Sequence, residues 1–177
     1  VFQCLLGVND SGFESPYEWL AAAQVASRLT LSRGFVDQSL DSARQRWSKT
    51  PEITALRETV AALVQSHGGV MTAADLSLAV LTARGSIEEE PVRSAVASAV
   101  TRAGLETEVN QSQPRFLIHR RGLVVLVAQS VELADYAAKL GDKADELAAL
   151  DPLPNPIRVV ESLRAIEVPT GAPPLPE

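Results

Sequence analysis

The run RFLIHRRGLVVLVA, residues 115–128, decides how the middle of this chain folds. Two β-rich runs flank the short basic segment RRG, and Gly122 suits the tight turn of a hairpin. Directly upstream, residues 89–104 (EEPVRSAVASAVTRAG) have the pattern of a helix, with Pro91 near its start and Gly104 after its last basic residue. The pattern therefore predicts a helix that leads into a two-stranded hairpin.

Further upstream, residues 50–69 predict another helix. Its apolar residues recur at helical spacing, Pro51 suits the first helical position, and a Gly-Gly pair ends it. The tripeptide VMT (70–72) is a very short strand candidate, and its Thr72 can cap a helix over residues 73–85. The order helix, strand, helix, helix, strand, turn, strand is that of a winged helix.

The N-terminal segment predicts two helices joined by a short polar turn. The stretch YEWLAAAQVASRL (17–29) places apolar residues at helical spacing, and Ser32 is a good N-cap for a second helix. The apolar residues of the two helices are Trp19, Leu20, Ala23, Ala26 and Leu29, followed by Val36, Leu40, Ala43 and Trp47. This arrangement is the helix-turn-helix plan.

The C-terminal third is acidic. Residues 130–150 predict an amphipathic helix or a pair of helices, DPLPNP (151–156) breaks it, and residues 156–166 predict a last short helix. The expected fold is thus mainly α, with a helix-turn-helix, a winged helix with a small β-hairpin, and an acidic helical extension. The expected segments are 1–49, 50–130, 131–166, and a disordered tail or linker over 167–177.

Composition limits the classes of function. The 177 residues carry a net charge of −6, which argues against a protein that coats DNA, because nonspecific affinity comes from neutralising phosphates. Residues 1–50 have five acids and five bases, whereas residues 131–177 have nine acids and four bases. The acidity is therefore mostly C-terminal, and nucleic-acid contact stays open for the N-terminal part.

Localisation and chemistry are also bounded by composition. No apolar run approaches a membrane span, and the start VFQCLLGV has no signal-peptide pattern, so we expect a cytoplasmic piece of a larger protein. The single Cys4 and two histidines predict no metal site, and we expect no cofactor. There is no glycine-rich loop with a strand lysine, no HRD and no DFG, so we expect no catalysis by this chain.

Residues 20–49 resemble the helix-turn-helix of sigma factor region four. The resemblance rests on VASRLTLSRGFVDQSLDSARQRW (25–47), with a small Ala26 in the first helix, Leu29 before the turn and Ser32 opening the second helix. One departure is Thr30, where the family usually has glycine. The resemblance implies that the outer face of the second helix contacts DNA.

On that analogy, Arg33 and Gln38 are candidates for contacting base edges in the major groove. Arg44, Arg46 and Lys49 are candidates for holding phosphates. The neighbouring carboxylates oppose this interpretation, because an acidic side chain on that face repels the DNA backbone. They are Asp37 and Asp41.

Arg120 and Arg121 at the predicted hairpin tip are further candidates for DNA contact, as is usual for the wing of a winged helix. The alternative is a tip that is polar only because it is exposed. In the helix before the hairpin, Arg93 and Arg102 lie among serine and threonine residues, which predicts a polar, weakly basic face.

A second resemblance covers most of the chain. Residues 43–86, 114–122 and 133–156 resemble, in arrangement, the region beyond the kinase domain in large actinobacterial serine/threonine kinases of phage-defence systems, the phage-growth-limitation or BREX type. It implies a module that positions its parent on double-stranded DNA or on protein partners. The alternative to DNA binding is a protein-interaction module that reuses the same helices. Its partners would be domains of the parent, other defence or regulatory proteins, or further copies packed through the alanine-rich surfaces.

Overall fold

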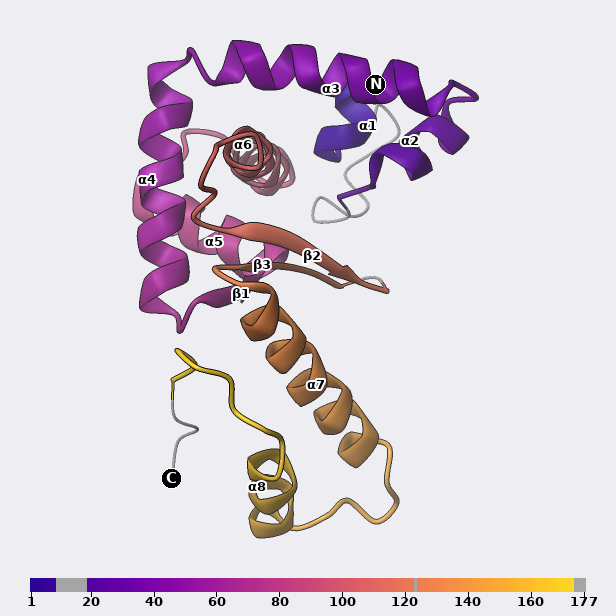
Figure 1. Ribbon diagram of the computed structural model, residues 1–177, viewed down its shortest axis with the longest axis vertical. Helices are drawn as coiled ribbons and strands as arrows, with labels where there is room; N and C mark the ends of the chain where they lie inside the picture. Colours follow the sequence, from indigo (N-terminus) through magenta and orange to yellow (C-terminus); the bar gives the residue numbers. More distant parts are fainter. Residues whose placement is uncertain (9–18, 123, 174–177) are drawn as a thin grey trace.

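The computed structural model describes residues 1–8, 19–122 and 124–173. It is mainly helical, with one small antiparallel sheet (Figure 1). The helices are α1 (Phe2–Leu6), α2 (Ala22–Arg28), α3 (Arg33–Trp47), α4 (Pro51–Ser66), α5 (Ala73–Arg84), α6 (Val92–Glu108), α7 (Val131–Ala148) and α8 (Pro156–Arg164). The strands are β1 (Val70–Thr72), β2 (Leu117–Arg121) and β3 (Val124–Ala128).

The hairpin and the short strand form as predicted. β3 lies between β1 and β2 and pairs antiparallel with both, so that Val70 and Leu117 are each in register with Ala128. Gly122 has φ of 57°, the left-handed conformation that the tight turn after β2 requires. The sheet therefore joins a strand that precedes α5 to the hairpin that follows α6.

Local capping explains where several helices begin. The side chains of Ser32, Thr72 and Ser130 accept hydrogen bonds from backbone N–H groups in the first turns of α3, α5 and α7. Thr50 precedes Pro51 at the start of α4, as expected, but its hydroxyl donates to the carbonyl of Arg46 and does not cap the helix. The predicted N-caps Ser32 and Thr72 thus mark the starts of α3 and α5.

Helix α6 runs through the middle of the molecule and is the most deeply buried element (Figure 1). Its predicted end at Gly104 is wrong, because the helix continues to Glu108. A Cβ on Gly104 would lie 3.3 Å from the Leu56 side chain, so this glycine permits a close approach of α4. The predicted polar face is also buried: Ser98, Thr101 and Arg102 are at most 1% exposed.

Two hydrophobic clusters flank α6. The larger lies among α4, α5, α6 and the sheet, and the smaller packs α1 and α2 beneath α3. The larger includes Trp19, Leu56, Val60, Val64, Met71, Leu76, Val80, Leu105, Phe116, Val125 and Val127; the smaller consists of Leu5, Val25, Ala26, Val36 and Leu40. α1 joins the smaller cluster although the sequence had not suggested a helix there.

Trp19 departs from its predicted place in a helix. α2 begins only at Ala22, and Trp19 precedes it, buried in the larger cluster with its indole N–H donating to Ser98 Oγ at 2.8 Å. The predicted helix start at residues 17–18 lies outside the described residues. Trp19, which the sequence pattern placed in a helix, instead links the N-terminal segment to α6.

Buried ion pairs fix the end of α6. Glu108, 1% exposed, accepts hydrogen bonds from Arg57 of α4 and from Arg115, which also pairs with Glu58. Burial alone would raise the pKa of Glu108, but the hydrogen bonds from Arg115 and Arg57 outweigh it and lower the pKa from 4.5 to about 2. The carboxylate is therefore ionised throughout the neutral range.

Because the pKa of Glu108 is lowered in the folded state, its stabilisation is present above pH 4.5 and lost as the pH falls towards 2. That loss should be on the order of 3 kcal/mol of unfolding free energy. Glu108→Gln should be less stable than the wild type at neutral pH, and the difference should shrink on acidification. Urea unfolding across this pH range measures it, and a constant difference would contradict the assignment.

Thr30, in the turn between α2 and α3, has φ of 54°. This is where the resembled family usually has glycine, and a β-branched residue is strained in that conformation. We expect Thr30→Gly to raise the unfolding free energy by about 1 kcal/mol. Thr54→Gly, at an exposed position within α4, is the matched control and should lower it by about 0.4 kcal/mol. Thermal unfolding of the two variants checks the opposite signs.

Candidate functional site

Helix α3 forms the outer edge of the molecule at its N-terminal end (Figure 1). Val36, Leu40 and Ala43 are buried against the smaller cluster, which leaves the opposite side of the helix in solvent. Four of the predicted DNA-contacting residues lie exposed on α3 or directly after it: Arg33, Gln38, Arg46 and Lys49. Arg33 has 75% of its side chain exposed.

The two aspartates of α3 form ion pairs along the helix. Asp37 lies 3.5 Å from Arg33 Nε, one turn away, and Asp41 lies 2.9 Å from Arg44 Nη1. Each carboxylate is thereby neutralised by an arginine of the same helix. Over residues 28–49 five bases face two acids, a net charge of +3 in a chain of net charge −6.

Arg44 is held inside the fold. Its side chain is only 18% exposed, and Nη2 donates to Glu106 of α6 at 2.6 Å while Nη1 donates to Asp41. Both terminal nitrogens are therefore occupied by carboxylates. Arg44 therefore links α3 to α6.

Arg44 and Arg120, 76 positions apart, line one concavity of about 350 Å³ between α3, α6 and β2. Arg102 and Glu106 of α6 lie at its base, and Asp37 lines it from α3. Burial is the largest cause of the lowered pKa of Arg102, to about 10, although Glu106 opposes it; burial also lowers the pKa of Arg120. The concavity is thus lined by three arginines and two carboxylates.

These arginines bind backbone carbonyls of the N-terminal segment. Arg102, 2% exposed in its side chain, donates to the carbonyls of Leu5 and Leu20, and Arg120 donates to the carbonyl of Trp19. Three carbonyls that no helix or strand satisfies are thereby paired. The sequence placed Arg102 on a predicted polar face and gave Glu106, which lies beyond the predicted helix end, no role, and it did not reveal that both are buried.

The hairpin arginines also have internal partners. Arg121 forms an ion pair with Asp142 of α7, and Arg115 binds Glu108 and Glu58. Arg121 remains 46% exposed. Of the seven predicted contacts, Arg33, Gln38, Arg46 and Lys49 are therefore presented on the surface of the α3 region, whereas Arg44, Arg120 and Arg121 hold other elements in place.

Helix α6, which precedes the hairpin, is covered on its polar face. α1 and α3 pack against it, and the ties from Arg102 and Arg44 close the contact. In this arrangement the face of Ser98, Thr101 and Arg102 cannot enter a DNA groove. The helix available to an outside partner at this end of the molecule is α3.

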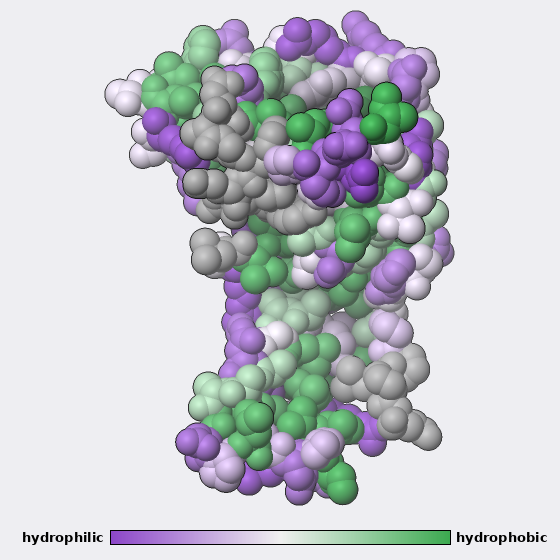
Figure 2. Space-filling model, turned by 180° about the vertical axis from the view of Figure 1, so that it is seen from behind, coloured by the Kyte–Doolittle hydropathy of each residue, from purple (hydrophilic) through white to green (hydrophobic). Residues whose placement is uncertain are grey.

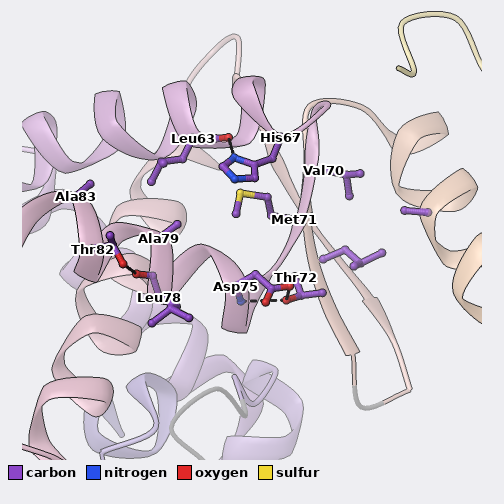
Figure 3. Close-up of a pocket in the computed structure, with 12 residues that line it drawn as sticks. Leu63, His67, Val70, Met71, Thr72, Asp75, Leu78, Ala79, Thr82 and Ala83 are labelled. Carbon is purple, nitrogen blue, oxygen red and sulfur yellow. Dashed lines mark hydrogen bonds between the residues drawn. The ribbon is translucent and has the colours of Figure 1, made fainter. Parts of the chain in front are cut away.

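Another concavity, of about 880 Å³, lies among α4, β1, α5, β3 and α7 (Figure 3). Its lining is mostly apolar, and its polar side chains serve helix ends: His67 Nδ1 lies 2.8 Å from the carbonyl of Leu63, and Thr72 donates to Asp75 at 2.6 Å.

Within the described ranges, no group of three or more His, Cys, Asp or Glu side chains is arranged to hold a metal ion. The helices of the described part include none long and apolar enough to cross a membrane.

The chain is homologous to part of a probable kinase, PglW of Streptomyces coelicolor. The two are 33% identical over 175 residues, which covers 87% of this chain and 11% of that protein. The chain thus spans about a tenth of the relative's length. No family model matches the chain. No solved structure matches it either. The resemblance inferred from sequence to a large kinase is confirmed at this level.

Arg44 and Arg46 differ by two positions but should differ greatly in their effect on stability. Arg44→Ala leaves the buried Glu106 with one fewer partner and should cost about 2–3 kcal/mol of unfolding free energy. Arg46 is exposed, and its guanidinium carbon lies 5.8 Å from the centroid of the Phe2 ring, so Arg46→Ala should cost less than about 1 kcal/mol. Equal losses in urea unfolding would refute the structural role of Arg44.

Proposed function

We propose that this chain is a DNA-contacting module of a larger phage-defence protein and performs no catalysis itself. Homology to a segment of a probable kinase supports the place of the module in a larger protein. The phage-defence context follows from the sequence resemblance to kinases of such systems.

The observation that carries the proposal is the exposed cationic surface of the α3 region. Arg33, Gln38, Arg46 and Lys49 are exposed along about 20 Å of helix, a length comparable to part of a major-groove turn. The acids that opposed this interpretation are paired with arginines along the same helix. The remaining charge on this surface favours a polyanion although the whole chain is acidic.

In this proposal α2 and α3 act as a helix-turn-helix. Their junction supports it, because Thr30 adopts the left-handed conformation at the position where the resembled family has glycine. Residues 50–130 would form a winged helix whose third helix, α6, serves as a support. The element order and the β1-β3-β2 sheet favour this assignment.

Each residue would have a separate role. Arg33 and Gln38 would contact base edges, and Arg46 and Lys49 would contact phosphates. Arg44 would set the orientation of α3 through Glu106. Arg120 and Arg121 would hold the hairpin beside it, and the exposed part of Arg121 is free to approach the backbone of the duplex.

A second candidate function is protein docking, because the acidic α7–α8 end exposes large apolar side chains. Leu153 and Ile157 are each 70% exposed, and none of the residues of α8 is buried. Such surface is more apolar than a solvated helix requires. The two functions use opposite ends of the molecule and are compatible.

Titration of a labelled DNA duplex with the chain at two salt concentrations tests the first proposal. Arg46→Ala with Lys49→Ala should weaken binding about tenfold at low salt and make the affinity less dependent on salt, because two phosphate contacts are lost.

Arg158→Ala is the matched control, since it removes an exposed positive charge from α8 at the other end of the molecule. It should leave the affinity unchanged. Absence of binding at low salt, or an equal effect of Arg158→Ala, would refute DNA contact by α3.

A further inference from the structure

Helix α8 is too short and too exposed to be stable through its own contacts. It has nine residues, none of them buried, and isolated helices below about 12–15 residues are marginal in water. Its own Val159 and Leu163 are only partly buried, and the helix packs against α7. A further partner on the open side would complete its burial.

The open side carries a row of large apolar side chains. Leu150, Leu153, Ile157 and Val160 fall within eleven residues and are 37–70% exposed. Figure 2 shows hydrophobic surface gathered at this lower end of the molecule. Around it, residues 142–161 contain five acids and two bases, a net charge of −3. A partner for this surface must therefore combine apolar side chains with positive charge.

The opposite end of this chain has those properties. Leu31 and Phe35, at the α2–α3 turn, are 38% and 52% exposed, and residues 28–37 around them carry two bases and one acid, a net charge of +1. α3 and α8 lie at opposite ends of the long axis, so the two surfaces of one molecule are far apart (Figure 1). They can meet only between molecules.

We propose that the chain associates head to tail, with the apolar, cationic α2–α3 turn of one copy docked on the acidic, apolar α7–α8 hairpin of a second copy. The contact is heterologous, since each copy uses two different surfaces, and it leaves one free surface at each end. It goes beyond DNA binding and does not depend on it. Desolvation of Leu150, Leu153, Ile157 and Val160 supplies the attraction, and the opposite charges orient the copies.

Sedimentation equilibrium of the 177-residue chain over a range of concentrations tests the proposal. The average mass should rise with concentration and fall back at high salt, because the opposed charges are then screened. Two double variants disrupt one surface each. Leu31→Asp with Phe35→Asp disrupts the α2–α3 turn, and Leu153→Asp with Ile157→Asp disrupts the α7–α8 end. Each should weaken self-association at least tenfold.

A mixture of the two double variants gives the decisive result. Each retains one intact surface, so the mixture should form a one-to-one complex that grows no further. Leu78→Asp with Ile87→Asp is the matched control, because these apolar residues are 56% and 99% exposed but lie on neither surface. It should associate like the wild type, and circular dichroism confirms that each variant is folded.

Three outcomes would overturn the proposal. One is a wild-type chain that stays monomeric at every concentration and at low salt. Another is an equal loss of association in the Leu78 and Ile87 control. The third is a mixture of the two double variants that remains monomeric. The variant Leu153→Asp with Ile157→Asp should bind DNA with unchanged affinity, so failure of docking and failure of DNA contact are separate results.

Discussion

The buried guanidinium of Arg102 is the interaction on which the arrangement of this molecule depends. It lies between the two hydrophobic clusters, donates to the carbonyls of Leu5 and Leu20, and has Glu106 one turn away. Glu106 in turn holds Arg44 of α3. A charge this deep in a protein is costly unless it is paired, so every one of these partners is needed at once. The position of α3 relative to α6 follows from that requirement.

The contact of α6 with α3 and the N-terminal segment is polar, and this has consequences that an apolar contact would not have. Apolar surfaces can slide with little loss, whereas hydrogen bonds and ion pairs require a particular geometry. The ties from Arg102, Arg44 and Arg120 therefore fix α3 in one orientation over α6 and beside β2. Two of these ties occupy Arg44 and Arg120, which the interpretation of the sequence assigned to DNA contact. The cations left at the surface are those of α3 that point away from this polar contact.

The parts of the fold that were predicted from sequence are those set by near neighbours. Ser32 and Thr72 cap helices through bonds three residues away, and Gly122 permits a turn by its own backbone freedom. The errors concern contacts across the chain. Trp19 matched a helical stripe but packs against α6, 79 positions from its partner Ser98. Gly104 looked like a helix end, yet it makes room for Leu56.

In the candidate site, too, the sequence did not predict the contacts between charges that are far apart in the chain. The number of charges on α3 can be counted from the sequence, but how strongly a charge acts on a ligand depends on whether it is buried against an internal partner. Arg44 and Arg46 are two positions apart, and the turn of the helix directs one to Glu106 and leaves the other in solvent. Asp37 and Asp41, which seemed to oppose an anionic ligand, are matched by arginines along the same helix. The net charge of −6 therefore describes the chain as a whole and hides two ends of opposite sign. A molecule with such ends has one surface suited to polyanions and another suited to cations, and its acidic average decides neither.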